Sequence, residues 1–296
     1  MAGLKEVRIR IASVKSTEQI TNAMKMVAAS KLRRAQNAIL KLRPYAAKLR
    51  EIMQNLSASA DDTNENSYTE VRKAERILLV VVTSNRGLCG AFNSNIIKLA
   101  VSRINNTYKI QNQNHAVDLI TVGKKASDFF RKQKYQVIES WDNVYDSLTF
   151  ETVAPKARML MQLFADKKYD RIELIYNQFK NAAVQRQMVE QYLPLVPETP
   201  QEQTNLKEVE ADYIFEPDIE TILSELIPKT LRIQLFKGIL DSFAAEMGAR
   251  MTAMHQATEN ARQLLKDLRI SYNKARQNQI TREIIEIVSG AEALKG

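Results

Sequence analysis

The residues that come closest to forming a chemically active site lie in the segment Ser84–Gly90, which reads Ser-Asn-Arg-Gly-Leu-Cys-Gly. The segment follows a run of Val and Leu and precedes a helical pattern, so its glycines could let backbone N–H groups approach a phosphate. Its spacing matches neither G-x-x-x-x-G-K-[ST] nor G-x-G-x-x-G. The sequence therefore favours a tight strand-to-helix turn over a nucleotide-binding loop.

Cys89 is the one cysteine of the chain and could in principle act as a nucleophile. Its neighbours Leu88 and Phe92 are apolar and no histidine lies near it in sequence, so we expect a buried structural thiol. A single cysteine excludes an internal disulfide framework and a metal site built on several thiolates.

The two histidines, His115 and His255, lack the neighbouring ligands that a metal site requires. The carboxylates are scattered over helix faces and no pair marks a cleft. The sequence thus contains no recognisable catalytic set. We predict a chain that is not an enzyme and that needs no metal or cofactor.

The central part of the chain alternates strand and helix patterns, which predicts a mainly parallel, Rossmann-like sheet covered by helices. The run at 76–83 is rich in Val and Leu and is typical of a buried strand. The further predicted strands are 117–122, 135–138, 171–176 and 188–196, and the predicted helices are 91–109, 124–132 and 149–168.

The N-terminal segment is predicted to be one long helix, because residues 4–43 contain neither Gly nor Pro. Apolar residues recur at steps of three and four, which indicates a helix that winds around a partner. Pro44 is expected to bend this helix without ending it. The expected contact positions are Leu4, Val7, Ile11, Val14, Ile20, Met24 and Val27, then Ala35, Ala38, Leu42, Tyr45, Leu49, Ile52 and Leu56.

The C-terminal segment shows a stricter pattern and is the expected partner. No Gly or Pro occurs from Ala249 to Ser289, and a helix this long is not stable alone in water. The expected contact positions are Leu240, Ala244, Met247, Met251, Met254, Thr258, Ala261, Leu265, Leu268, Tyr272 and Ala275, followed after a slip by Ile280, Ile284 and Ile287.

Two stretches are predicted to be linkers: Ser57–Glu70 is polar, and Pro194–Pro217 holds four of the seven prolines. The fold class is therefore α/β, a long antiparallel coiled coil of terminal helices with a central Rossmann-like domain. The predicted parts are a helix at 1–56, a linker at 57–74, the α/β domain at 75–196, a linker at 197–217 and a helix at 218–296.

The charge is concentrated in the first fifty residues, which hold twelve Lys and Arg against only Glu6 and Glu18. A basic helix predicts an acidic partner: nucleic acid, anionic lipid or acidic protein loops. Residues 1–44 contain no aromatic residue for base stacking and no nucleic-acid motif is present. A basic nucleic-acid-binding coiled coil stays open as the alternative function. The sequence contains no run of 18 apolar residues, which is about the length needed to span a membrane.

Four segments carry a resemblance to the γ subunits of F-type ATP synthases, in the order that this family shows. They are Ile20–Leu32, Ser84–Asn93, Ala249–Met254 with Ala257-Thr258, and Ile280–Glu286 with Gly290-Ala291. The family usually has Asp after the Ser of the turn, whereas this chain has Asn85. The resemblance is to the bacterial type.

The resemblance implies a central rotor stalk that couples ion-driven rotation of the membrane c ring to conformational cycling of the catalytic β subunits. The implied partners are the α and β subunits of the α3β3 hexamer, the ε subunit and the c ring, with no nucleic acid. Membrane association through the complex alone implies a peripheral position on the cytoplasmic face of the bacterial inner membrane.

The resemblance also implies site residues. Those matching β-subunit contacts are Met24, Lys25, Arg250, Arg276, Gln277, Thr281, Glu283 and Glu286, and those matching c-ring contacts are Tyr213, Phe215 and Glu216. The apolar C-terminal end, which includes Ile284, Ile285, Ile287 and Val288, is expected to rotate inside a ring of apolar residues, an apolar collar.

Overall fold

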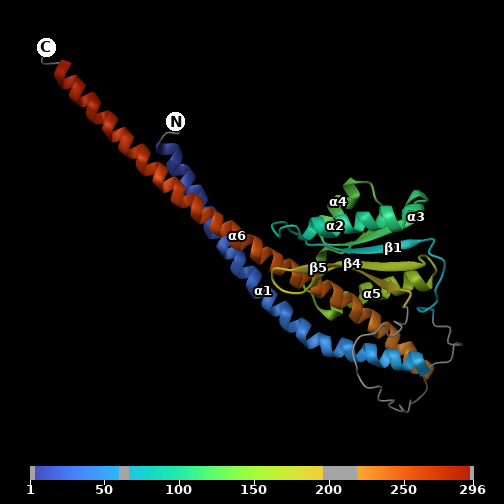
Figure 1. Ribbon diagram of the computed structural model, residues 1–296. Coiled ribbons are helices and arrows are strands. Elements are labelled where there is room, and N and C mark those ends of the chain that lie inside the picture. The colour runs from blue at the N-terminus through green and yellow to red at the C-terminus, as the bar shows by residue number, and fades with distance from the viewer. Residues whose placement is uncertain (1–3, 60–66, 196–218, 294–296) are drawn as a thin grey trace. The chain divides into compact units, whose positions relative to one another are not determined.

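The computed structural model describes residues 4–59, 67–195 and 219–293. The chain forms two compact units (Figure 1): a coiled-coil unit, Met1–Ala29 with Arg250–Gly296, and an α/β unit, Ser30–Ala249. Two helices, α1 (Leu4–Ser59) and α6 (Ile219–Ala293), supply residues to both units. Pro44 lies inside α1 without ending it, as the sequence predicts.

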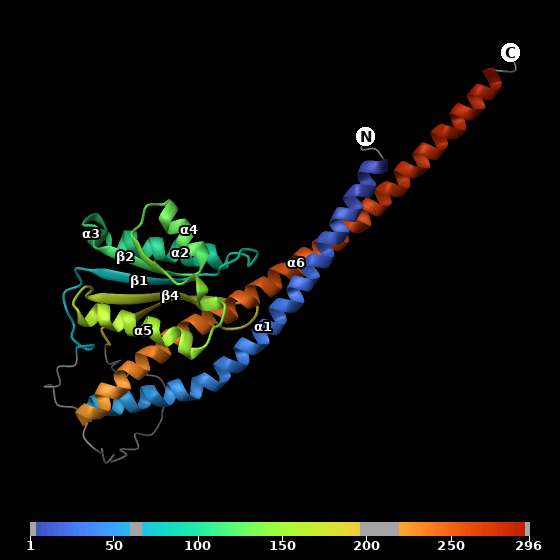
Figure 2. The ribbon, with the colours of Figure 1, turned by 180° about the vertical axis from the view of Figure 1, so that it is seen from behind.

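In the coiled-coil unit the two helices run antiparallel, because contacts that advance along α1 go backward along α6. Arg8 Nη2 donates a hydrogen bond to the Tyr272 hydroxyl at 3.0 Å, and the Thr258 hydroxyl donates to Thr21 Oγ1 at 2.9 Å. Both ribbon views show the two helices side by side (Figures 1 and 2). The predicted antiparallel pairing of the terminal helices is confirmed.

The face of α1 that packs against α6 differs in part from the predicted one. Val7 is buried as expected, but Ile20 and Val27 are 57% and 56% exposed. The buried positions are their successors, Thr21 and Ala28. The prediction assigned the larger apolar residues to the interface, whereas the helix buries small ones. Alanine allows close approach, and a bonded threonine hydroxyl is tolerated there.

The interface face of α6 agrees with the prediction over most of its length. The buried residues are Met254, Thr258, Ala261, Leu265 and Leu268. From Arg276 onward every described residue is exposed, Ile280, Ile284 and Ile287 included. The described part of α1 begins at Leu4, and Arg8 already lies beside Tyr272. No described residue of α1 therefore remains to cover the end of α6.

The α/β unit is built on a five-stranded sheet in the order β3-β2-β1-β4-β5. Strands β1 to β4 are parallel, and β5 pairs antiparallel with β4 at the edge. The strands are β1 (Ile77–Val82), β2 (Val117–Val122), β3 (Val137–Ser140), β4 (Arg171–Phe179) and β5 (Gln185–Leu193).

Helices cover both faces of this sheet. The helical elements are α2 (Phe92–Ser102), the π-helical turn η1 (Arg103–Thr107), α3 (Lys109–Gln113), α4 (Lys124–Lys132), the 3₁₀ turn η2 (Asp142–Tyr145) and α5 (Phe150–Ala165). Leu78, Val80 and Val82 of β1 pack with α5 and α6, and the alternate residues pack with α2 and α4. Burial on both faces explains why β1 reads as a continuous apolar run.

A glycine lets α6 lie close to the sheet. A Cβ added to Gly238 would stand 2.5 Å from Leu174 Cδ2 of β4. Opposite faces of the same strand serve different helices, because Leu174 belongs to the core shared with α5 and α6 while Ile175 belongs to the core under α2 and α4. The segment of α6 from 219 to 249 is thus an integral layer of the α/β unit.

The predicted fold class is confirmed, with local differences in several elements, including β4, which ends at Phe179 instead of Tyr176. Strand β3 starts two residues later than predicted, and β5 starts at Gln185 instead of Met188. The predicted helix over 91–109 is divided by the π-helical turn at Arg103–Thr107. Among the described residues no helix is long and apolar enough to cross a membrane.

The π-helical turn holds a buried ion pair. Glu173 of β4 is 2% exposed and accepts hydrogen bonds from Arg103 Nη2 at 2.7 Å and from Arg103 Nε at 2.9 Å. The Tyr108 hydroxyl also donates to Glu173 Oε1. Burial, followed by the bond to Glu173, raises the pKa of Tyr108 to about 12, so the phenol stays a donor. These bonds satisfy a carboxylate that a β-strand would otherwise bury at high cost.

We expect Glu173→Gln to lower the free energy of unfolding of the α/β unit by about 2–3 kcal/mol, since it leaves the Arg103 guanidinium without its counter-ion. The side chain of Arg103 is 31% exposed and keeps some access to water, which limits the loss. Urea titration of the full chain measures it. Glu75→Gln, which breaks an exposed pair with Lys73, is the control and should change stability little. Equal losses in the two variants would contradict this account.

The hydroxyls of Thr21 and Thr258 should show a non-additive effect on stability, because they bond to each other in the interface. We expect Thr258→Val to weaken the coiled-coil unit, and the double change with Thr21→Val to recover about 1 kcal/mol. Thermal unfolding of the four proteins of the cycle measures the coupling. Thr17→Val is the matched control, since Thr17 bonds only to Ser13 O. The effects of Thr17→Val and Thr258→Val should be additive, and coupling between these two changes would count against the interpretation.

Candidate functional site

The glycine-containing turn is closed by its own side chains. The Ser84 hydroxyl donates to Arg86 O at 2.6 Å, Ser84 N donates to Asn93 Oδ1 at 2.9 Å, and Asn93 Nδ2 donates to Ser84 Oγ at 2.8 Å. Leu88 and Gly90 adopt positive φ, which reverses the chain into α2. These polar groups are used within the turn, as expected for a structural connection.

Asn85 attaches this turn to two other segments. Its Nδ2 donates to Asp142 O at 2.8 Å, and its Oδ1 accepts from Lys124 N at the start of α4 at 3.1 Å. An aspartate could accept the second bond but could not donate the first. The asparagine that departs from the family pattern thus uses both halves of its amide to connect β1, η2 and α4.

Cys89 is buried, at 1% exposure, as the sequence predicts. Asn93 Nδ2 lies 3.3 Å from its Sγ. No described histidine lies within the turn, and the apolar Leu88 beside Cys89 points outward at 64% exposure. This environment is that of a structural thiol, not of an activated nucleophile.

The crevice that binds ligands in many parallel sheets is filled here by side chains. Such crevices lie at the carboxyl ends of the strands where the strand order reverses, which is between β1 and β4 in this sheet. The Tyr145 hydroxyl donates to Thr83 O at 2.8 Å, and its ring stacks on Phe243 at 5.9 Å. Burial, with a smaller effect of Glu246, raises the pKa of Tyr145 well above its ordinary value. Asn177 of β4, 2% exposed, donates to Phe92 O.

One cavity of the α/β unit lies at the opposite, amino-terminal ends of the strands. It has a volume of about 210 Å³ and is lined by Arg76, His115, Ala116, Asp118, Lys168 and Tyr169. The Tyr169 hydroxyl donates to Asp118 Oδ2 at 2.7 Å, so the acid is already engaged. In the described parts of the chain, no three His, Cys, Asp or Glu residues are grouped as metal ligands would be. This cavity does not bring a nucleophile and a base together.

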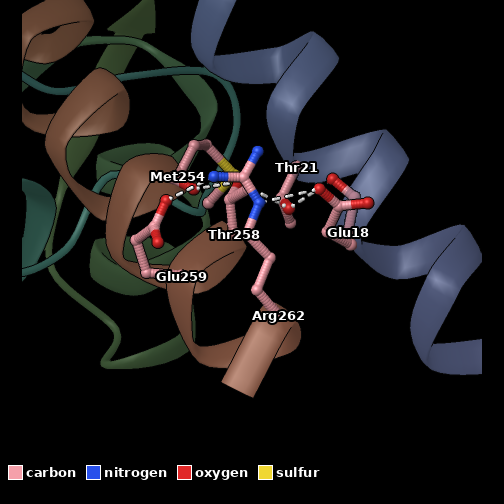
Figure 3. A network of polar contacts seen from close by, with 6 residues as sticks. All are labelled: Glu18, Thr21, Met254, Thr258, Glu259 and Arg262. Carbon is pink, nitrogen blue, oxygen red and sulfur yellow. Dashed lines mark hydrogen bonds and ion pairs between the residues drawn. The ribbon is translucent and has the colours of Figure 1, made fainter. Parts of the chain in front are cut away.

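The coiled-coil unit contains a polar network within its interface (Figure 3). The Thr258 hydroxyl lies 2.9 Å from Thr21 Oγ1 and 2.7 Å from Met254 O. Beside it, Arg262 forms ion pairs with Glu18 of α1 at 3.1 Å and with Glu259 at 2.8 Å. A bonded polar pair at an interface position fixes the register of paired helices.

The predicted contact residues on α1 and on the first part of α6 are half-buried. Met24 and Lys25 lie at the border between the α6-facing side of α1 and its outer side, and Arg250 has a similar exposure. Each can therefore meet another molecule with only part of its side chain.

The predicted contact residues near the end of α6 are fully accessible. Arg276, Gln277, Thr281, Glu283 and Glu286 are all exposed and lie on successive turns of the helix. Two of them are already oriented, since Thr281 donates to Gln277 O at 2.9 Å and Glu283 accepts from Gln279 Nε2 at 2.9 Å. The predicted c-ring residues Tyr213, Phe215 and Glu216 lie outside the described residues.

Two apolar surfaces on the helices remain uncovered by the described chain. The surface on α6 consists of Ile280, Ile284, Ile285, Ile287 and Val288, whose exposed fractions range from 48% to 70%. The surface on α1 consists of Ile9, Ile20, Met26 and Val27, from 56% to 61% exposed. The sequence analysis missed the α1 surface because it assigned Ile20 and Val27 to the interface. The available signal was the number of apolar residues, which exceeds what one narrow helix face can hold.

Comparison with known proteins identifies relatives along the whole chain. The family model described as ATP synthase matches residues 3–294. A protein of Christiangramia forsetii named ATP synthase gamma chain is 54% identical over 296 residues, covering 100% of both chains. The protein of the same name from Cytophaga hutchinsonii is 50% identical over 294 residues, covering 99% of both.

Solved structures share the architecture. A chain of the Euglena gracilis mitochondrial ATP synthase, in a structure of OSCP, F1 and c-ring, gives a TM-score of 0.71 at 22% identity, covering 98% of this chain and 94% of that one. A chain of the Tetrahymena thermophila central stalk and c-ring gives 0.56 at 26%, covering 80% and 99%. With a matching family model and relatives at 50% identity and above, this chain belongs to the gamma chain family of the F-type ATP synthases, in its bacterial form.

Proposed function

We propose that this chain is the non-catalytic central rotor stalk of an F-type ATP synthase. Its most telling feature is the antiparallel coiled coil whose α6 continues beyond the described part of α1, with every described residue exposed from Arg276. Exposed isoleucines on a long helix indicate a surface supplied by another molecule. A rotating element of this kind would couple movement of the membrane c ring to conformational cycling of the catalytic β subunits.

The proposed partners are those of the central stalk. The similar chains come from assemblies described as F1 with c-ring and as central stalk with c-ring. By analogy, the α3β3 hexamer would surround the coiled-coil unit, and the ε subunit and c ring would hold the other end. Tyr213, Phe215 and Glu216 remain the proposed c-ring contacts. The alternative of a nucleic-acid-binding module finds no support among the relatives.

The basic charge of α1 fits an acidic surface on the β subunits. Lys5, Arg10 and Lys15 are exposed on the outer side of α1, and Lys31 and Arg34 follow. We infer that Met24 and Lys25 meet an acidic β-subunit loop, where the half-buried methionine packs and the ammonium pairs. Attraction between opposite charges would hold this loop against the helix while apolar contact allows it to slide.

The end of α6 supplies the other proposed β-subunit contacts. Arg276, Gln277, Thr281, Glu283 and Glu286 offer both charges and amide groups, and Arg250 adds a cation at the start of the coiled-coil unit. Between and beyond them, Ile284, Ile285, Ile287 and Val288 would turn in an apolar collar. An apolar surface is non-directional, so contact there changes little with rotation angle.

Coupling would act through differential binding. The polar contacts are directional and occur on particular faces of the helices, so each rotor angle favours a different conformation of each β subunit. A shift from 1:99 to 99:1 between two conformations needs about 5.5 kcal/mol of differential interaction. A few charge-assisted contacts per angle supply energy of that order. The bonds that are broken and formed in ATP belong to the hexamer.

We place the protein on the cytoplasmic face of the bacterial inner membrane, held there by the complex alone. The described residues contain no spanning helix, and the proposed role requires no cofactor.

Reconstitution tests the proposed function. We expect this chain, mixed with α and β subunits from the same source, to form a complex of one copy per three α and three β. The complex should hydrolyse ATP faster than α and β alone, whereas the isolated chain should be inactive. Mass photometry and a coupled ATPase assay measure both properties. Failure to form the complex would refute the stalk assignment.

Met24→Lys tests the proposed contact with the acidic loop. The added ammonium would strengthen the contact at one angle and hinder rotation past it, so protons pumped per ATP hydrolysed should fall severalfold while assembly persists. The matched control is Gln19→Lys, which adds the same charge at an exposed polar position of α1. Quenching of a pH-sensitive dye in vesicles reports pumping. An unchanged ratio in Met24→Lys would remove Met24 from the contact.

A further inference from the structure

Asp241 of α6 is a buried carboxyl group in the α/β unit. The residue is 2% exposed, and its Oδ1 has no hydrogen-bond partner among the described residues. The Ser242 hydroxyl beside it is likewise fully buried and without a partner. Burial of an unpaired polar group is costly, and the cost is far larger when the group is charged. Of the two states of Asp241, the protonated one therefore suits this site better.

A small cavity adjoins this carboxyl group, where α1 packs on α6 within the α/β unit. It is lined by Ile39, Leu42, Arg43 and Ala46 of α1 and by Lys237 and Asp241 of α6. Its volume is about 10 Å³, at the lower limit for a single water molecule. The interface here is thus nearly dry and mostly apolar, so it offers Asp241 little solvation.

Three charged groups face Asp241 from the surrounding elements. Lys237 lies one turn earlier on α6 and Arg43 comes from α1, and both favour the carboxylate. Glu190 of β5 opposes it. Glu190 is held in place by the Tyr176 hydroxyl at 2.8 Å and by Gln234 Nε2 at 2.8 Å. Loss of solvation outweighs the two cations and raises the pKa of Asp241 to about 6.

We propose that Asp241 is a proton-binding site that makes the packing of α1 on α6 in the α/β unit depend on pH. The neutral carboxyl group fits the closed interface. The carboxylate favours a local opening, in which water and the two nearby cations can reach it.

The sign of the effect follows from the two pKa values. An exposed aspartate has a pKa of about 3.9, and the folded form holds its proton more tightly because burial raises that value. The contribution of this site to stability is complete below the exposed value. It is lost as pH rises from there through the folded value of about 6. The interface should therefore open more readily at pH 7.5 than at pH 5.

Hydrogen exchange in the full chain tests this proposal. We expect the opening constant of α1 peptides covering residues 35–46 to rise about tenfold from pH 5 to pH 7.5 in the wild type relative to Asp241→Asn. Comparing the two proteins at each pH cancels the intrinsic dependence of exchange on pH. The asparagine keeps the shape of the side chain but cannot ionise. The exposed Asp267→Asn is the control and should parallel the wild type.

A second variant keeps the test informative if Asp241→Asn folds poorly. Arg43→Gln removes one of the cations that favour the carboxylate, so the upper end of the pH range over which protection falls should move upward. Arg34→Gln, exposed on the same helix, should leave it in place. The proposal is overturned if protection of residues 35–46 follows the same pH profile in the wild type and Asp241→Asn, or if Arg43→Gln leaves the transition unmoved.

Discussion

The pairing of α1 with α6 is the interaction on which the rest of the structure depends. A helix of 75 residues is not stable in water without a partner, and α1 supplies one. The helices bury small residues, such as Ala28 against α6 and Ala261 against α1, which allows them to lie close together. A narrow interface leaves most of each helix surface free. Several larger apolar residues of α1, among them Ile20 and Val27, consequently face outward, where another molecule can contact them.

Polar groups at three places, buried beside these helices and the sheet, are accommodated in different ways. The hydroxyls of Thr21 and Thr258 bond to each other and fix register at little electrostatic cost. Glu173 accepts hydrogen bonds from Arg103 and Tyr108, which compensate for its burial. Asp241 Oδ1 has no donor among the described residues, and a protonated carboxyl group suits that site better. This third arrangement makes the packing around Asp241 depend on pH.

The sequence predicted an element best where its apolar residues follow a single periodicity, either that of a strand or that of a helix. The strand at 117–122 and the helix at 124–132 match β2 and α4 residue for residue, and the pattern around Leu265 marks a truly buried face. The prediction failed where two candidate interface positions, Ile20 and Thr21, lie side by side. Residues 20 and 21 both suit a helix interface, and hydrophobicity alone favours isoleucine over threonine. Only the partner hydroxyl of Thr258 decides for Thr21, and that information lies 237 residues away. The contact residues at the end of α6 rest on resemblance, because an exposed helix carries no mark of its future partner.

The α/β unit shows why its topology is a poor guide to activity. Its four parallel strands and their helices form an arrangement that often binds nucleotides where the strand order reverses. In this chain Tyr145, Phe243 and Asn177 fill that position, and Ser84 and Asn93 use the polar groups of the adjoining turn on each other. A ligand could enter only by breaking those contacts. The segment of α6 that carries Phe243 also covers the sheet. The same packing therefore closes the crevice and attaches the sheet to the long helix. The packing that attaches the sheet to α6 thus occupies the position where sheets of this topology often hold a ligand.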